Sequence, residues 1–128
     1  MKLLLLIDAG HGLYTYGKRC LKTLDPNETR EWFLNNRIAE YLEDEMEAYE
    51  DVVVARLDDP TGKRDVPLKE RADKANKLYA QYIALGYVVI IISIHHNAGI
   101  NGGRGGGITT IVDSRRASAR SLEIRDRI

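Results

Sequence analysis

The sequence predicts an α/β fold with an open, mainly parallel, twisted sheet and helices on both faces. Short apolar runs alternate along the 128-residue chain with segments in which apolar residues recur at helical spacing. The first run, residues 3–7, is apolar at every position, which is typical of a strand covered on both faces of a parallel sheet. Strands that alternate with helices form βαβ units. We expect one domain over residues 1–128.

The first half of the chain contains two expected strands and one expected helix. The strand at residues 3–7 ends at the turn-forming segment 8–12, and a loop follows. A helix is expected to begin at Asp25 and end near Ala48, because an acidic cap, a proline and then Glu28 follow in the order typical of a helix start. Residues 52–55 form the second expected strand. The apolar stripe of the helix is predicted to consist of Leu34, Ile38, Tyr41 or Leu42, and Met46.

The second half is expected to continue the alternation. A helix begins near Pro67 and ends near Gly86, and the apolar run at residues 87–94 is the strongest strand candidate. A glycine-rich loop covers residues 102–107, a fourth strand is expected at residues 108–112, and a last helix at residues 114–128. The stripe of the Pro67 helix is predicted to consist of Leu68, Ala72, Ala75, Tyr79 and Tyr82.

Composition excludes several classes of protein. Basic and acidic residues balance at 19 each, which argues against nucleic acid as a partner. A single cysteine excludes a disulfide framework and a CxxC zinc site. The glycine-rich loop lacks the Gly-Lys-Ser/Thr ending of a phosphate-binding loop. The apolar runs are too short for a membrane span or a signal peptide, so we expect synthesis in the cytoplasm without membrane insertion.

The histidines follow two of the expected strands. His11 comes just after the first, and His95 and His96 end the third. Ligands bind at the carboxyl ends of strands in open α/β sheets, so if these two strands are neighbours, the imidazoles meet at one edge. A catalytic zinc site commonly adds a carboxylate and leaves one position to water. Glu28 and Glu31 are the candidates, and spacing alone does not choose between them.

Five motifs occur in a fixed order along the chain. They are Asp-Ala-Gly-His-Gly at 8–12, Glu31 followed by Asn35, Arg56, Leu-Lys-Glu-Arg-Ala-Asp-Lys-Ala-Asn at 68–76, and Ser-Ile-His-His-Asn-Ala at 93–98. In these motifs the chain resembles the zinc-dependent N-acetylmuramoyl-L-alanine amidases of the amidase 3 type, which occur among bacterial cell-wall hydrolases and phage endolysins. The resemblance covers nearly the whole chain.

The resemblance implies the residues of the site. It selects His11, Glu31 and His95 as zinc ligands, and it places His96 and Asn97 in the substrate pocket. The implied activity is zinc-dependent hydrolysis of the amide bond between N-acetylmuramic acid and L-alanine in peptidoglycan. The implied partners are the stem peptide and the glycan. We expect a monomer that reaches the cell wall after holin-mediated or other lytic release.

One departure from the family leaves the catalytic acid/base unassigned. The family carries a second glutamate in a Glu-x-Gly-Phe segment after the fourth strand and the following helix, and this chain ends at Ile128 without that segment. We therefore expect the last strand and helix of the family fold to be missing. The alternative function is a truncated, catalytically weak, zinc-containing module that binds peptidoglycan. A third hypothesis is an ordinary α/β domain whose histidines hold no metal.

Overall fold

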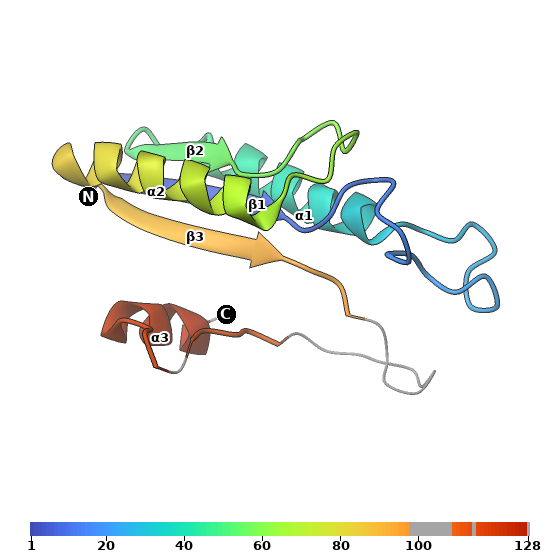
Figure 1. The fold of residues 1–128 in the computed structure, drawn as a ribbon. Helices are drawn as coiled ribbons and strands as arrows, with labels where there is room; N and C mark the ends of the chain where they lie inside the picture. The colour runs from blue at the N-terminus through green and yellow to red at the C-terminus, as the bar shows by residue number, and fades with distance from the viewer. Residues whose placement is uncertain (98–108, 114, 128) are drawn as a thin grey trace. The chain divides into compact units, whose positions relative to one another are not determined.

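A computed structural model describes residues 1–97, 109–113 and 115–127. The chain divides into two compact units, Met1–His96 and Asn97–Ile128 (Figure 1). The first unit contains all the strands found in the described residues and two of the helices. The elements in chain order are β1 (Leu3–Ala9), α1 (Glu31–Met46), β2 (Val52–Arg56), α2 (Leu68–Ala84), β3 (Val88–Ile94) and α3 (Ala119–Arg127).

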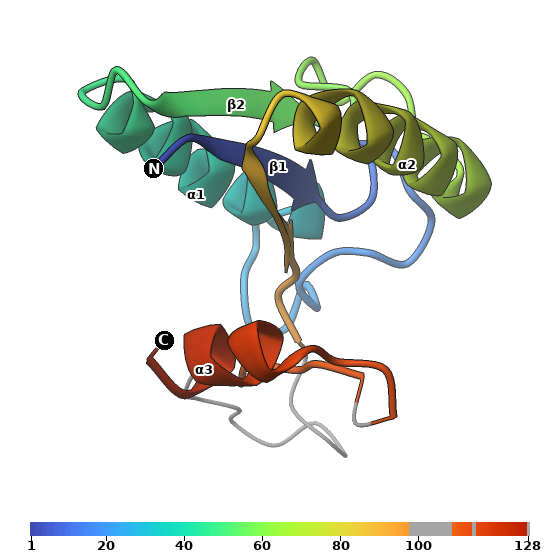
Figure 2. The same ribbon diagram turned by 90° about the vertical axis from the view of Figure 1, so that its left-hand side faces the viewer.

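The sheet of the first unit confirms the predicted fold class. Its strands run parallel in the order β2-β1-β3. The register pairs Leu3 with Val52 on one side and with Val88 on the other, and Ala9 lies opposite Ile94 at the carboxyl end. Helices α1 and α2 cover opposite faces of this sheet (Figures 1 and 2). The first and third strands therefore end side by side, which is the condition under which the histidines that follow them meet at one edge.

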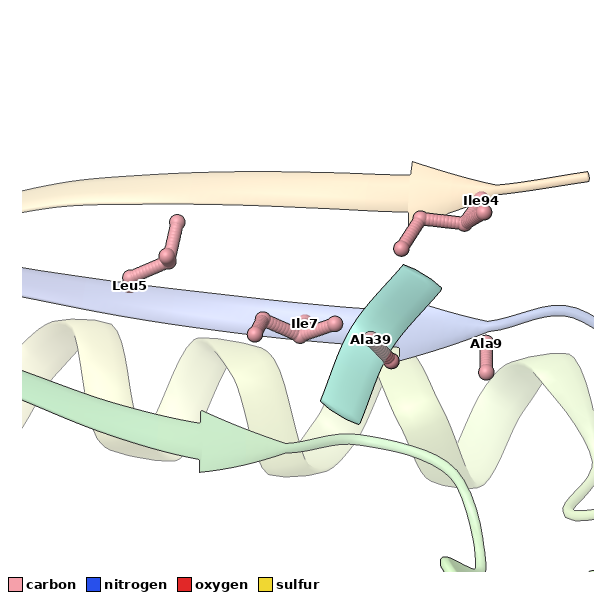
Figure 3. Close-up of a cluster of buried hydrophobic side chains, with 5 residues drawn as sticks. All are labelled: Leu5, Ile7, Ala9, Ala39 and Ile94. Carbon is pink, nitrogen blue, oxygen red and sulfur yellow. The ribbon is translucent and has the colours of Figure 1, made fainter. Parts of the chain in front are cut away.

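Strand β1 is apolar throughout because both of its faces are buried. Successive side chains of a strand point to opposite faces. Leu5 and Ile7 therefore pack toward Ala39 of α1 (Figure 3), whereas Leu4 and Leu6 pack in the cluster that includes Ala75 of α2. Each fully buried leucine or isoleucine stabilises the fold by about 1.5–3 kcal/mol.

The predicted start of the first helix is wrong. Helix α1 begins at Glu31, six residues after Asp25. The Asp25 carboxylate accepts hydrogen bonds from the backbone amides of Asn27 and Thr29, which closes a turn and not a helix. Glu28 has a φ of 49°, in the left-handed region that a right-handed helix excludes. The acidic cap and the proline therefore mark a turn that precedes the helix.

The predicted apolar stripes of both helices are partly wrong. On α1, Leu42 and Met46 pack against the core, but Ile38 and Tyr41 are exposed, and Trp32 and Ala39 are buried instead. On both helices an alanine contacts the sheet. The buried face of each helix is therefore rotated relative to the face that the large apolar residues predict. On α2, Ala75 and Tyr82 join the core as expected, whereas Leu68, Ala72 and Tyr79 are exposed.

The second unit differs from the sequence prediction. The described part of the expected fourth strand, residues 109–112, is not a strand. A strand requires a ladder of hydrogen bonds to a neighbour, and these residues have none in the described parts of the chain. Ile108 and the glycine-rich loop 102–107 lie outside the described residues. The last helix begins at Ala119 instead of residue 114, because Ser118 accepts a hydrogen bond from the amide of Ser121 at its start. Among the described helices, none has the length and apolar content needed to cross a membrane.

Candidate metal centre

The candidate site lies where β1 and β3 end. The backbone amide of Gly10 donates to the carbonyl of Ile94 at 3.0 Å, which keeps the two chain segments together beyond the strands. His11 and His95 follow directly. His11 has a φ of 69°, so the chain turns sharply there and leaves the direction of β1. Glu31, the first residue of α1, faces both histidines.

Glu31 contacts both imidazoles. Its Oε2 lies 3.3 Å from Nε2 of His11, and its Oε1 lies 3.2 Å from Nδ1 of His95. The two rings meet edge to face, with centroids 5.0 Å apart and an interplanar angle of 86°. The same Oε1 accepts a hydrogen bond from the backbone amide of His96 at 3.2 Å. The carboxylate is thus fixed between the ends of two strands.

Burial and charge favour neutral imidazole at His11. Burial lowers the pKa of His11 below its ordinary value, and the positive charge of Lys18 and the neighbouring His95 lower it further, whereas Glu31 opposes the change. The side chains of His11 and Glu31 are 19% and 12% exposed, whereas that of His95 is 46% exposed. Since a metal binds the neutral ring, this environment prepares His11 for coordination.

The donor set fits a zinc ion. One ligand atom from each of His11, Glu31 and His95 lies within 4.8 Å of the others. Neighbouring ligand atoms on a tetrahedral zinc ion are separated by about 3.3 Å, given metal–ligand distances of about 2.0 Å. The carboxylate oxygens of Glu31 stand at 3.2 and 3.3 Å from the imidazole nitrogens. Two imidazoles with one carboxylate, and a fourth position open, is the pattern of a catalytic zinc site.

The side chains of Glu28 and His96 are not part of this cluster. Glu28 forms an ion pair with Arg19 at 3.1 Å instead of approaching the histidines. The ring of His96 turns toward Asn35, with Nδ1 2.7 Å from the amide oxygen. Asn97 begins the second unit, and its place in a substrate pocket stays a prediction, as does that of His96.

Arg71 stabilises the turn that carries His11. The guanidinium is buried and donates to the carbonyls of Ala9 at 2.9 Å and His11 at 3.2 Å. It also pairs with the carboxylates of Asp8 and Asp65. A buried cation with these partners joins α2 to the end of β1.

A hollow of about 510 Å³ opens beside the cluster. His11 and His95 line one part of it, and residues 65–68 with Arg71 line another. This volume lies within the range of small-molecule binding sites, about 300–1,000 Å³. A substrate group held there would contact both candidate histidine ligands.

Sequence reasoning missed the structural part that Asn35 plays at this site. Asn35 is fully buried and donates through Nδ2 to the carbonyl of Gly10 at 3.0 Å. The spacing to Glu31 could have indicated it, because residues four apart share one face of a helix. Asp65, which lines the hollow, belongs to no motif and carried no signal in the sequence.

Comparisons with known proteins show what the chain is similar to. A family profile described as N-acetylmuramoyl-L-alanine amidase matches residues 5–128. The crystal structure of N-acetylmuramoyl-L-alanine amidase from Clostridium difficile 630 is similar over 97% of this chain and 59% of that chain, with 28% identity and a TM-score of 0.75. The catalytic domain of CwlV, an N-acetylmuramoyl-L-alanine amidase from Bacillus (Paenibacillus) polymyxa var. colistinus, is similar over 79% of this chain and 48% of that one, with 24% identity and a TM-score of 0.59. No curated protein matches significantly.

The fold and the family match define the class of protein. The chain belongs to the N-acetylmuramoyl-L-alanine amidase family, which confirms the resemblance read from the motifs. It spans 59% of the length of the Clostridium difficile structure. The likeness to CwlV supports the fold alone.

Proposed function

We propose that this protein hydrolyses the amide bond between N-acetylmuramic acid and L-alanine in peptidoglycan, with zinc bound by His11, Glu31 and His95. The observation that carries the proposal is the meeting of these three donors within 4.8 Å, at the carboxyl ends of β1 and β3. Family membership makes this bond the candidate substrate. Residues 1–128 would then form one catalytic domain.

The chain's own residues prepare this chemistry. When bound, zinc supplies Lewis acidity toward an amide carbonyl and lowers the pKa of water to about 7. Glu31 orients both imidazoles, and Arg71 fixes the backbone of His11. The hollow beside His11 and His95 would receive the substrate. A substrate-binding role for His96 and Asn97 is proposed from the family resemblance alone. In the reaction the bond from the lactyl carbonyl carbon to nitrogen breaks, and water supplies a hydroxyl to carbon and a proton to nitrogen.

The general acid/base is unassigned, and one observation favours the weaker alternative function. The carboxylates that line the hollow are Asp8 and Asp65, and both pair with Arg71. Among the described residues that line the hollow, no carboxylate is therefore without a cationic partner. A zinc-containing module that binds peptidoglycan but cleaves it slowly is therefore the second candidate.

Product analysis tests the proposal. Purified peptidoglycan treated with the zinc-loaded protein should release new L-alanine amino termini without new reducing sugar ends. A glycosidase would use a pair of carboxylates and produce reducing ends. The matched control is His11→Ala, which removes one ligand. Reducing ends in the digest would overturn the amidase assignment, and zinc-dependent binding to peptidoglycan without new amino termini would support the binding module.

We further propose that the protein works at the cell wall as a monomer, with neither nucleic acid nor membrane insertion. Its partners would be the stem peptide and the glycan chain. Holin-mediated or other lytic release would bring it to the wall, as in a phage endolysin. Lysis of cells only when the protein and a holin are expressed together would support this route.

A further inference from the structure

Asn35 connects the two chain segments that carry the histidines. Its amide nitrogen donates to the carbonyl of Gly10, the residue before His11, at 3.0 Å. Its amide oxygen lies 2.7 Å from Nδ1 of His96, the residue after His95. Asn35 is 0% exposed. The bond to Gly10 is buried and the bond to His96 is partly buried, so an unpaired amide at Asn35 would be costly.

The partners of Asn35 fix its orientation and the proton position on His96. A backbone carbonyl can only accept a hydrogen bond, so the NH₂ group of Asn35 must face Gly10. The amide oxygen then faces His96, and an oxygen acceptor requires a proton on Nδ1 of that ring. The lone pair that a metal would bind is absent at this nitrogen. Nδ1 of His95 faces a different group, Oε1 of Glu31 at 3.2 Å, which is the carboxylate proposed to hold the same metal ion.

We propose that Asn35 is a positioning residue of the metal centre, which sets the separation of His11 and His95 and keeps Nδ1 of His96 from coordinating. It lies one turn after Glu31, so one helix face carries both a ligand and the group that ties the ligand-bearing segments together. This inference rests on the proposed zinc site. Partners outside the ligand shell typically change metal affinity by about 10–100-fold.

The experiment compares Asn35→Leu and Asn35→Asp with a matched control, Asn36→Leu. Asn36 is also a buried asparagine of α1, but its side chain contacts Arg56 and Glu40. Zinc affinity is measured by competition with a chelator, and thermal unfolding is measured on the metal-free proteins. Asn35→Leu should weaken zinc binding about 10–100-fold. The zinc affinity of Asn35→Asp should lie between those of Asn35→Leu and the wild type, because the carboxylate still accepts a hydrogen bond from His96 but cannot donate one to Gly10.

The control separates positioning from folding. Asn36→Leu should lower the unfolding temperature yet keep the wild-type zinc affinity. Equal weakening of zinc binding in Asn36→Leu and Asn35→Leu, or wild-type affinity in Asn35→Leu, would overturn the inference.

The proton position gives a readout that needs no metal. Nitrogen-15 NMR of the metal-free protein in alkaline buffer, where imidazole is neutral, should show His96 protonated at Nδ1. This preference should disappear in Asn35→Leu and persist in Asn36→Leu. A proton at Nε2 in the wild type would overturn the assignment. A wild-type protein that takes up no zinc would overturn the proposed function and the metal part of this inference, whereas the NMR result would still test the contact between Asn35 and His96.

Discussion

The ring of His95 lies directly against the backbone of Gly10. A Cβ atom built at residue 10 would overlap Cε1, Nδ1 and Nε2 of that ring. Gly10 is not among the glycines with positive φ, so the site requires its small size and not its conformational freedom. The close approach brings His95 near the end of β1, where His11 begins the next segment.

Substitution Gly10→Ala should therefore disturb the metal centre. The added methyl group would displace the His95 ring, and we expect zinc affinity to fall by about tenfold or more, the scale seen when the surroundings of a ligand change. Chelator competition measures the effect. Gly17→Ala is the control, because a Cβ there meets no atom within 4 Å, although its φ of 73° adds backbone strain. Unchanged affinity in Gly10→Ala would show that His95 is not a ligand.

Removal of single ligands should reduce the zinc content. The wild type should bind about one zinc ion per chain, and His11→Ala, Glu31→Ala and His95→Ala should each lose most of it, since two ligands remain from three. Metal analysis after dialysis measures this. Glu28→Ala is the control and should retain zinc, whereas His96→Ala, which removes one partner of Asn35, should keep more zinc than the three ligand variants. If Glu31→Ala kept its zinc and Glu28→Ala lost it, the carboxylate ligand would be Glu28 and not Glu31.

Arg71 should contribute strongly to stability. Arg71→Leu leaves Asp8 without its cation and removes donors to the backbone of Ala9 and His11, so the free energy of unfolding should fall by about 3–5 kcal/mol. Urea denaturation measures this. Lys69→Ala on the same helix is the control: its pair with Asp73 is exposed, and its loss should cost at most about 1 kcal/mol. Similar losses in both variants would contradict the network described for Arg71.

Two leucines test which side chains form the core. Leu6 is 0% exposed, and Leu6→Ala should lower the free energy of unfolding by about 2–5 kcal/mol. Leu68 is 83% exposed although the sequence places it on the apolar stripe of α2, and Leu68→Ala should change stability by about 0.5 kcal/mol or less. Thermal or urea unfolding of both variants measures the difference. A large loss of unfolding free energy in Leu68→Ala would show that Leu68 packs in the core, as the sequence predicts.

The predicted elements differ in how well they agree with the structure, for physical reasons. Strand β1 is recognised from its sequence because burial on both faces requires an unbroken apolar run. The buried faces of the helices are harder to predict. An alanine such as Ala39 can contact a sheet more closely than the larger Ile38, so the size of an apolar side chain does not show which face of the helix packs on the sheet. The start of α1 was misplaced because Asp25 closes a turn with the same side-chain chemistry that caps a helix.

The sequence by itself determined the parallel α/β architecture, the family, and the placement of His11 and His95 at strand ends. These follow from apolar periodicity and local motifs, which lie within short stretches of chain. Spacing alone left Glu28 and Glu31 open and the family pattern selected Glu31, but only the tertiary structure shows Glu31 against both histidines and Asn35 between Gly10 and His96. These contacts join residues at least 20 positions apart, because the packing of α1 against the sheet brings them together.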